Sequence, residues 1–433
     1  MAWTHRIGGA LLSLAVAGAA HAQVMVATPQ QEQAPAKAAL QAQAVPLDEI
    51  RRYVTVFNAV RAAYVEPVAD TQLMQSAIRG LLLELDPHST YLDAEQAKVF
   101  EEQSRGAYEG IGVEVQTLKD KALRVIAPIE GGPAAQAGVL PGDVIVGVDG
   151  KTMATNTDAE PLRGPAGSSV TLSIRRQGQA KALDIVVQRQ TIRLTSVRSR
   201  MLEPHYGYIR ISTFQADTAT DFAQHAKTLA EQSAGGLKGV ILDLRSNPGG
   251  LLTAAVQIAD ELLDSGTIVS TRGRLSSSDS HFQATTGQLL PDTALLVLVD
   301  AGSASASEVL AAALADNQRA RIIGSRTFGK GSVQSVLPLD NGDSIKLTTA
   351  RYYTPNGRSI QAVGITPEIV LQPEAATPDA GAYREAGLGG HLQGEEEQET
   401  AGEPAGDFLP GEAPIQQALA ALKAMPAQPD SAD

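Results

Sequence analysis

The feature that most constrains this chain is a strand, turn and helix pattern between residues 295 and 316. Residues 295–299 are all apolar, which is typical of a strand buried on both faces, as in a parallel sheet. The small-residue cluster Ser303-Ala-Ser-Ala-Ser307 follows this strand, and residues 308–316 have the composition of a helix. Similar strand and helix patterns alternate from about residue 190 to residue 371. The sequence therefore predicts an α/β core for this region.

The serine cluster lies where a catalytic nucleophile can be held, at the turn between a strand and a helix. The first N–H groups of a helix have no partner within it, so they can stabilise a negatively charged oxygen. Lys330 has a glycine on each side, which predicts a turn rather than a solvated helix face. If this lysine reaches a serine, the chain is a serine–lysine hydrolase. The residues alone do not choose among Ser303, Ser305 and Ser307, because one of them can instead cap the helix.

A glycine loop follows another predicted strand. Its sequence, Asp243-Leu-Arg-Ser-Asn-Pro-Gly-Gly250, ends in two adjacent glycines. Such glycines let the backbone approach a substrate closely and direct N–H groups toward it. An Asn-Pro-Gly sequence also makes an ordinary tight connection, so the loop alone does not decide between the two interpretations. Together with the serine cluster and Lys330, the loop favours a catalytic role.

The first residues of the chain predict export. Arg6 precedes an apolar stretch over 7–20, and Ala20-His-Ala22 is a small-x-small cleavage site, so we expect a signal peptide over 1–22 that is cleaved after Ala22. The stretch is short for a membrane span, and we expect no integral membrane segment after cleavage. Cleavage removes Arg6, so 35 basic residues become 34 against 48 acidic ones and the net charge changes from −13 to −14. This charge argues against nucleic acid as a partner.

Composition and periodicity divide the rest of the chain into six segments. Low-complexity stretches rich in Gln, Ala and Pro, or in Gly, Glu and Pro, predict disorder, whereas helical spacing of apolar residues predicts packed helices. The segments are a flexible leader (23–45), an N-terminal helical region for oligomer contacts (46–96), a β-rich domain (97–189), the α/β core (190–371), a disordered acidic linker (372–410), and a terminal helix with its tail (411–433). In the core we expect strands at 207–212, 239–244, 267–271, 294–299, 320–324, 333–338 and 344–350, and helices at 217–232, 251–263 and 305–316.

The β-rich domain resembles a PDZ domain. Gly110-Ile-Gly-Val113 opens an alternating strand, and a Pro-Gly-Asp-Val-Ile turn follows at residues 141–145. In PDZ domains such a glycine loop binds the terminal carboxylate of a peptide, which adds a strand to an exposed edge. The resemblance implies peptide binding by Gly110, Ile111, Gly112 and Val113. The segment before Arg163 departs from the pattern, because it is about one helical turn short and contains Pro161, so we expect a weak or differently shaped groove.

Four segments in order resemble the carboxyl-terminal processing peptidase family, whose members are serine–lysine endopeptidases with an inserted PDZ domain. They are the glycine loop, Ser303-Ala-Ser-Ala-Ser-Glu308, Phe328-Gly-Lys-Gly331 with Gln334, and Tyr353-Thr-Pro-Asn-Gly-Arg-Ser-Ile360. Asp86-Pro-His-Ser-Thr-Tyr-Leu92 is similar to the family too, and the resemblance covers roughly residues 47–372. It implies an α/β multidomain protein with a crotonase-like or ClpP-like protease core, the inserted PDZ domain, an N-terminal helical region and a short C-terminal helix.

The same resemblance implies the roles of the site residues. Ser305 would be the nucleophile, Lys330 the general base, and Gln334 the residue that orients the lysine. The oxyanion donors would be the N–H of Ala306 and that of Gly249 or Gly250. Burial that lowers the pKa of the lysine from about 10.4 to about 7 would let it take the proton of the serine. Gln334 suits its role because a neutral amide does not restore the charge of the lysine.

The resemblance also implies the biological setting. We expect a periplasmic endopeptidase that acts near the apolar C-termini of protein substrates. Arg163 would link the position of the PDZ domain to the active site. A homo-oligomer is expected, and an adaptor protein is a possible activator. No cofactor is indicated.

The sequence lacks the residues that other hydrolytic mechanisms require. The chain has no cysteine, no His-Glu-x-x-His and no Gly-x-Ser-x-Gly, and the histidines of the mature chain have no paired metal spacing, so no metal site is expected. We interpret these histidines as structural or solvated: they are His88, His205, His225, His281 and His391. A chymotrypsin-like protease with PDZ modules would need a triad ahead of the PDZ domain, and none is visible. A catalytically gated or idle PDZ peptide-binding scaffold that requires an adaptor remains the alternative function.

Overall fold

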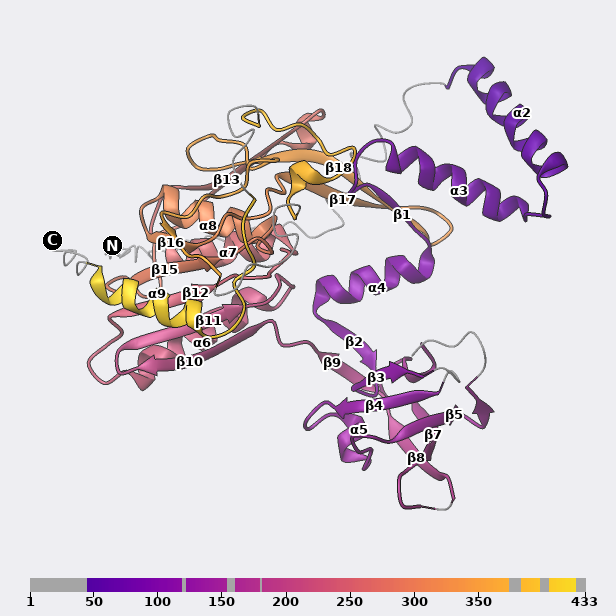
Figure 1. Cartoon of the computed structure of the whole chain (residues 1–433), viewed down its shortest axis with the longest axis horizontal. Helices are drawn as coiled ribbons and strands as arrows, with labels where there is room; N and C mark the ends of the chain where they lie inside the picture. Colours follow the sequence, from indigo (N-terminus) through magenta and orange to yellow (C-terminus); the bar gives the residue numbers. More distant parts are fainter. Residues whose placement is uncertain are drawn as a thin grey trace, which may run out of the picture. The chain divides into compact units, whose positions relative to one another are not determined.

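The computed structural model describes residues 45–118, 122–153, 160–179, 181–373, 383–397 and 405–425 (Figure 1). The predicted signal peptide, and the predicted leader apart from Val45, lie outside these residues. The chain divides into two compact units, Met1–Tyr53 and Val54–Asp433. The described part of the first unit ends within helix α2 (Leu47–Ala63), and the second unit contains every other described element.

Helices form where the apolar spacing of the N-terminal region predicts them. No residue of α2 is buried, and Leu82 is the one buried residue of α3 (Asp70–Leu83). Large apolar side chains are therefore exposed on both helices, among them Val56 at 58% and Leu81 at 67%. In the parts of the chain that the structure describes, no helix has the length and apolar character needed to cross a membrane.

The β-rich domain folds around its own apolar core. Its sheet has the order β3-β4-β5-β7-β8, with β6 paired to β5. The elements are β3 (Val113–Thr117), β4 (Leu123–Pro128), α5 (Pro133–Gln136), β5 (Val144–Val148), β6 (Lys151–Thr152), η1 (Glu160–Leu162), β7 (Ser169–Arg175) and β8 (Leu183–Gln188). Where a groove helix is expected, the described residues contain only the single 3-10 turn η1, which includes Pro161, and residues 154–159 lie outside the description. Helix α4 (Ala94–Arg105) comes before this sheet in the chain, and β2 (Ala107–Gly110) pairs with β9 (Gln190–Arg193).

The α/β core is built on a sheet of order β10-β11-β12-β15-β16-β19. Its strands are β10 (Val197–Glu203), β11 (Tyr206–Ile211), β12 (Gly239–Asp243), β15 (Ala294–Val299), β16 (Ala320–Gly324) and β19 (Ile369–Val370). Neighbours from β11 to β19 are parallel, and β10 is an antiparallel edge strand. Every residue of β12 and β15 is buried, as expected for central strands covered on both faces.

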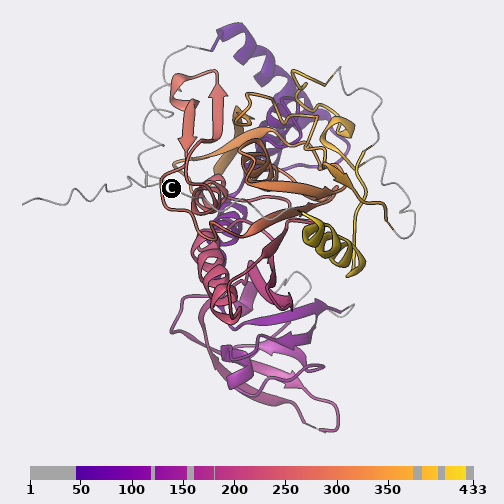
Figure 2. The same cartoon turned by 90° about the vertical axis from the view of Figure 1, so that its left-hand side faces the viewer.

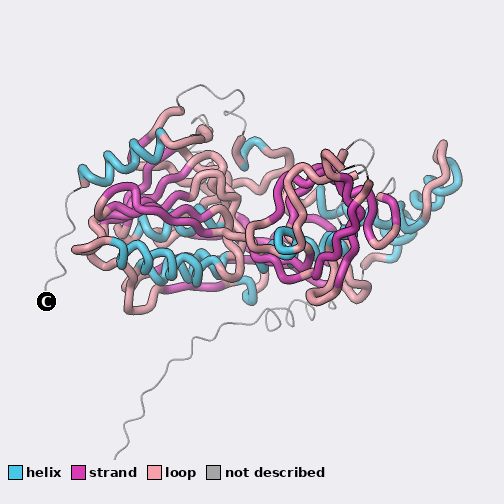
Figure 3. The backbone as a smooth tube through the Cα atoms, turned by 90° about the horizontal axis from the view of Figure 1, so that it is seen from below, coloured by secondary structure: helices cyan, strands magenta, loops and turns pink. Residues whose placement is uncertain are grey.

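Helices cover both faces of this sheet (Figure 3). Alternate strand residues point to opposite faces, so Leu295 and Val297 pack with one set of helices while Leu296 and Leu298 pack with another helix. The first set is α6 (Thr218–Gln232), α7 (Leu252–Leu262) and α8 (Ala306–Asp316). The terminal helix α9 (Ala413–Ala424) buries Ile415, Leu419 and Leu422 against the other face. The four helices and the strands β11, β12, β15 and β16 lie where the sequence pattern predicts them, whereas β10 and β19 were not predicted.

A second, antiparallel sheet lies within the same unit. Its order is β1-β18-β13-β14, with β17 also paired to β18. The strands are β1 (Thr90–Leu92), β13 (Thr267–Gly273), β14 (Ser280–Gln283), β17 (Ser332–Pro338) and β18 (Ser344–Tyr353), and η2 (Ser276–Ser278) connects the β13–β14 hairpin, which is salmon in Figure 2. Because β1 pairs with β18, the turn that begins at Asp86 is brought to the strand that also pairs with Gln334.

Part of the predicted acidic linker is folded against the core, contrary to the expected disorder over 372–410. The ring of Tyr383 lies 5.1 Å from that of Phe328 and 5.0 Å from that of Phe408. Glu385, in η4 (Glu385–Gly387), is fully buried. The acidic composition predicts solvation, but Glu385 has the distant hydrogen-bond partners His88 and Gln361, which composition does not reveal. Residues 374–382 and 398–404 lie outside the described residues.

Candidate active site

Three loops that the sequence singles out leave the same edge of the core sheet. Strands β12, β15 and β16 are parallel neighbours, so their carboxyl ends lie side by side. The glycine loop follows β12, the serine cluster follows β15, and the loop with Lys330 follows β16. The topology of the sheet therefore brings these three segments together.

Ser305 lies at the N-cap of α8 in a strained backbone conformation. Its φ of 56° and ψ of −114° lie outside the regions that non-glycine residues favour, and such strain is concentrated at functional sites. The residue is 7% exposed, and the hydroxyl of Tyr352 on β18 interacts with its side chain. The turn thus holds the Ser305 hydroxyl at the start of a helix, where backbone N–H groups lack helical partners.

The two other serines of the cluster have structural partners. The Ser303 hydroxyl donates to the Leu244 carbonyl at 2.8 Å, and the Ser307 hydroxyl donates to the Asn247 carbonyl at 2.9 Å. Both serines are fully buried. These two bonds tie the serine cluster to the glycine loop, so the geometry favours Ser305 as the candidate nucleophile.

Two glycines let the loop after β12 lie directly against this turn. Gly249 has a φ of 100°, and a Cβ there would be 2.9 Å from the Cβ of Ser305. Gly250 has a φ of 136°, and its Cβ would be 2.1 Å from a backbone oxygen. The Gly249 N–H donates to Asn247 Oδ1 at 2.9 Å, whereas no hydrogen bond among the described residues uses the N–H of Gly250 or Ala306. The last two are therefore the candidate oxyanion donors.

Lys330 is half-buried in the loop after β16. Burial lowers the pKa of its amine to about 8, and the positive charge of Lys346 on β18 acts in the same direction. The carboxylates of Glu385, Glu308 and Asp86 oppose this shift. With a pKa of about 8, roughly a tenth of the amine is neutral at pH 7, compared with about one part in 2,500 for an unperturbed lysine.

Glu308 joins the serine turn to the lysine loop, and it is not among the site residues predicted from the sequence. It is fully buried, and its Oε2 accepts the N–H of Ser305 at 2.7 Å and that of Lys330 at 2.9 Å. Its Oε1 accepts the Gly329 N–H at 2.7 Å and the Thr327 hydroxyl at 2.5 Å. Burial raises the pKa of Glu308 to about 7 against the effect of these donors. Ser-x-x-Glu spacing at the start of an otherwise apolar helix was the available sequence signal.

Gln334 has no hydrogen bond to Lys330 among the described residues. Its Nε2 donates to Ser332 Oγ at 2.9 Å and to Thr348 Oγ1 at 3.3 Å. Gln334 is on β17 and Thr348 is its partner on β18, so strand pairing directs the amide toward that strand. The expected orienting role is therefore not visible as a direct contact with the lysine.

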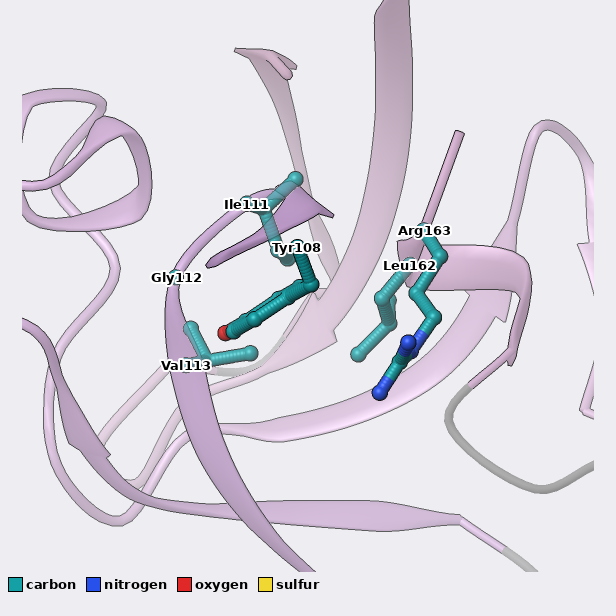
Figure 4. Close-up of a pocket in the computed structure, with 6 residues that line it drawn as sticks. All are labelled: Tyr108, Ile111, Gly112, Val113, Leu162 and Arg163. Atoms are coloured by element: carbon teal, nitrogen blue, oxygen red, sulfur yellow. The ribbon is translucent and has the colours of Figure 1, made fainter. Parts of the chain in front are cut away.

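In the β-rich domain, the loop Gly110-Ile-Gly-Val113 borders a pocket (Figure 4). The pocket is lined by Tyr108, Ile111, Gly112, Val113, Leu162 and Arg163. Three of the four expected peptide-binding residues are in this lining, and the fourth, Gly110, forms a β-bridge with Arg163. The Arg163 guanidinium pairs with Glu102 of α4 and lies 5.0 Å from the centre of the Tyr108 ring. Arg163 thus contacts both the pocket and α4.

We predict that Glu308→Gln destabilises the protein by about 3 kcal/mol, because the amide keeps one acceptor oxygen and presents an NH2 group to buried N–H donors. Urea unfolding of the mature chain measures this change. Glu101→Gln, at an exposed ion pair on α4, is the control and should change stability by less than about 0.5 kcal/mol. Equal stability of the Glu308→Gln variant and the unmodified chain would contradict the role of Glu308 in joining the serine turn to the lysine loop.

Comparison with known proteins finds matches to three parts of the chain. The family described as "Peptidase family S41" matches residues 205–371, "PDZ domain" matches residues 124–176, and "Activating protease CtpB N-terminal domain" matches residues 12–96. A solved structure of a photosystem II D1 C-terminal processing protease covers 74% of this chain and 92% of its own, with 31% identity and a TM-score of 0.44.

Two relatives extend the match over most of the chain. The carboxy-terminal-processing protease of Bartonella bacilliformis is 42% identical over 369 residues, which cover 84% of each protein. The carboxy-terminal processing protease CtpA of Bacillus subtilis is 36% identical over 327 residues, which cover 75% of this chain and 68% of CtpA. The chain therefore belongs to the carboxy-terminal processing proteases of peptidase family S41, and it is a serine-type endopeptidase.

Proposed function

We propose that this chain is a periplasmic endopeptidase that cleaves protein substrates near their C-termini, with Ser305 as the nucleophile and Lys330 as the general base. The observation that carries the proposal is the set of hydrogen bonds that Glu308 accepts from the serine turn and the lysine loop. One buried carboxylate binds the backbone N–H of both residues, so a strained serine and a half-buried lysine share a single rigid support. Such fixed geometry is what a nucleophile and its base require.

In the proposed mechanism the neutral Lys330 amine takes the proton of Ser305 while Oγ attacks the scissile carbonyl carbon. The N–H groups of Ala306 and Gly250 stabilise the oxyanion that forms. The lysine then gives its proton to the leaving amine, and an acyl-enzyme remains. A water molecule, deprotonated by the same lysine, attacks the ester, and collapse of that intermediate returns the proton to Ser305. Gln334 supports the lysine loop through Ser332.

The PDZ domain would capture the tail of the substrate. Strand β3 is the terminal strand of its sheet and begins at the loop Gly110-Ile-Gly-Val113. A peptide can therefore add along the edge of β3 with the peptide's carboxylate at that loop. The apolar lining of the pocket, which includes Ile111, Val113 and Leu162, suits an apolar C-terminal side chain. Arg163, which touches the pocket and Glu102 of α4, is the proposed gating residue because a bound tail would compete for its position.

Export, oligomerisation and activation are also part of the proposal. The predicted signal peptide supports a periplasmic location. The exposed apolar side chains of α3, including Leu81 and Leu83, support contacts with a second copy of this chain. The N-terminal region matches a domain described as belonging to an activating protease, and an adaptor that engages the resting enzyme is consistent with this region.

We predict that the purified mature chain cleaves a loosely folded protein such as casein, and that Ser305→Ala and Lys330→Ala each reduce the rate by at least about 1,000-fold. Casein fragments separated on a gel, together with the rate of product formation, measure this loss. Ser303→Ala is the matched control, because its hydroxyl has a structural partner, and it should retain a measurable rate.

Two outcomes would contradict the proposal. Cleavage that persists in Ser305→Ala would move the nucleophile to another residue. An inert wild-type chain that stays inert with periplasmic extract would favour the idle PDZ scaffold, whereas activity restored by the extract would reveal the adaptor.

A second prediction concerns pH. Lys330 acts as a base only when neutral, so kcat should be low in acid and rise as pH increases, with a midpoint near its pKa of about 8. Peptide hydrolysis measured from about pH 5.5 to about pH 9.5 gives the profile. Lys330→Arg should be inactive throughout, because a guanidinium stays protonated. A flat wild-type profile would argue against lysine as the base.

A third prediction concerns the peptide groove. A fluorescent peptide with an apolar C-terminus should bind to Ser305→Ala protein, and Gly112→Ala should weaken that binding by at least about 10-fold, because the loop there has a φ of 70° and a Cβ would be 3.0 Å from Ile192 Cδ1. Gly131→Ala has the same φ of 70° but open space around its Cβ, so it controls for backbone strain. Fluorescence anisotropy measures both. Equal binding of an amidated peptide would contradict carboxylate recognition.

A further inference from the structure

We propose that Glu385 and His88 are positioning residues for Lys330: two segments from opposite ends of the described chain meet beside the lysine loop and hold it in its catalytic position. This inference rests on the proposed role of Lys330 and adds residues to it. Neither Glu385 nor His88 takes part in the proposed chemical steps. From the sequence, Glu385 is expected in a disordered linker and His88 is expected to be structural or solvated.

Glu385 is a buried acid with a complete set of partners. It is 0% exposed, and its carboxylate accepts from His88 Nε2 at 3.0 Å on Oε1 and at 2.8 Å on Oε2. Gln361 Nε2 also donates to Oε1 at 2.9 Å. Because an ionised carboxylate only accepts hydrogen bonds, the Nε2 of His88 carries the proton in this contact. An unpaired buried carboxylate is costly, so these bonds fix where the segment around Glu385 can lie.

Hydrogen bonds connect Glu385 and its partner Gln361 to the backbone on both sides of Lys330. The Glu385 N–H donates to the Phe328 carbonyl at 2.9 Å, two residues before the lysine. Gln361, which Glu385 orients, accepts the Gly331 N–H on its Oε1 at 3.0 Å, one residue after the lysine. A Cβ at Gly331 would lie 2.2 Å from the Gln361 backbone nitrogen, so the two chains are in close contact there. Glu385 thus contacts the loop directly and through one amide side chain.

His88 connects Glu385 to the turn that precedes β1. Its backbone N–H donates to Asp86 Oδ1 at 2.8 Å, and Ser89 donates its hydroxyl to Asp86 Oδ2 at 2.6 Å. The Thr348 hydroxyl donates to Asp86 Oδ1 at 3.1 Å, and Gln334 in turn donates to Thr348. One continuous network therefore runs from Gln334 through the Asp86 turn to His88, Glu385 and the lysine loop.

The charge of Glu385 gives the proposal a readout that a purely structural role would not move. The charged groups that act on the Lys330 amine are Glu308 on α8, Asp86 before β1, Lys346 on β18 and Glu385 on η4. Removing the negative charge of Glu385 leaves the neutral amine more favoured. The activity of a Glu385→Gln variant should therefore begin to rise at lower pH than that of the wild type, even though its maximum rate is reduced.

The test uses the full mature chain and a peptide substrate over a pH series. We expect Glu385→Gln to lower kcat by about 10- to 100-fold with little change in KM, because a loosely held base is misplaced rather than absent. The midpoint of its pH profile should move to lower pH. Glu397→Gln is the matched control, since it removes the negative charge from the His391–Glu397 pair of 2.9 Å in the same segment while His88, Gln361 and Glu385 stay unchanged, and it should retain wild-type kcat and midpoint.

Variants of His88, which is less buried than Glu385, test the same contact. His88→Ala removes the donor and should lower kcat by about 10-fold, whereas His88→Gln keeps an N–H donor of similar reach and should recover most of that loss. These two variants decide the question if the Glu385 variant does not fold, which its thermal unfolding will show.

Three results would overturn the proposal: an unchanged kcat in Glu385→Gln or in His88→Ala, a reduced kcat with an unmoved pH midpoint, or an equal loss in Glu397→Gln. Ser305→Ala in the same assay separates these outcomes from a failure of the proposed function. If Ser305→Ala remains active, the serine mechanism fails and not the positioning network alone.

Discussion

The interaction on which the site depends is the buried carboxylate of Glu308. Placing an ionised carboxylate in a protein interior is costly unless hydrogen bonds replace its hydration. Here four donors do so, and each belongs either to the serine turn or to the lysine loop. The requirement is mutual, because the N–H groups of Gly329 and Lys330 would themselves be left without an acceptor if the carboxylate were removed. Together with the bond from the Phe328 N–H to the Ser303 carbonyl at 3.0 Å, this buried group therefore fixes the distance between the serine turn and the lysine loop.

The sheet makes this contact possible. Parallel strands place all their carboxyl ends at one edge, so the glycine loop, serine cluster and lysine loop begin close together. Gly249 and Gly250 then remove the side chains that would separate the loops. The antiparallel sheet contributes from another direction, because β1 and β17 both pair with β18 and carry the Asp86 turn and Gln334 to the same strand. The strained conformation of Ser305 is maintained by this surrounding structure rather than by local preference.

Much of this arrangement could be predicted from the sequence. Apolar runs with no alternation indicated the buried strands β12 and β15, and small residues between a strand and a helix indicated the turn at Ser305. The position of Glu385 could not be predicted in this way. It lies in a stretch rich in Gly and Glu, and its burial depends on His88, 297 residues away, and on Gln361. Composition measures the average cost of burying a segment, whereas a few specific partners decide whether one acid in it is buried.

The acids around Lys330 present an apparent conflict, since a base must be neutral and nearby carboxylates favour its charged form. Their hydrogen bonds resolve it. Glu308, Asp86 and Glu385 each accept several bonds from backbone N–H or side-chain donors, and among the described residues none of the three is bonded to the Lys330 amine. Their charges therefore act on the amine only at a distance, and burial with the repulsion of Lys346 outweighs them, which keeps the pKa at about 8. Acids that hold the backbone of the loop can thus fix the position of a lysine without pairing with it, and a lysine that is positioned but unpaired can both accept and return a proton near neutral pH.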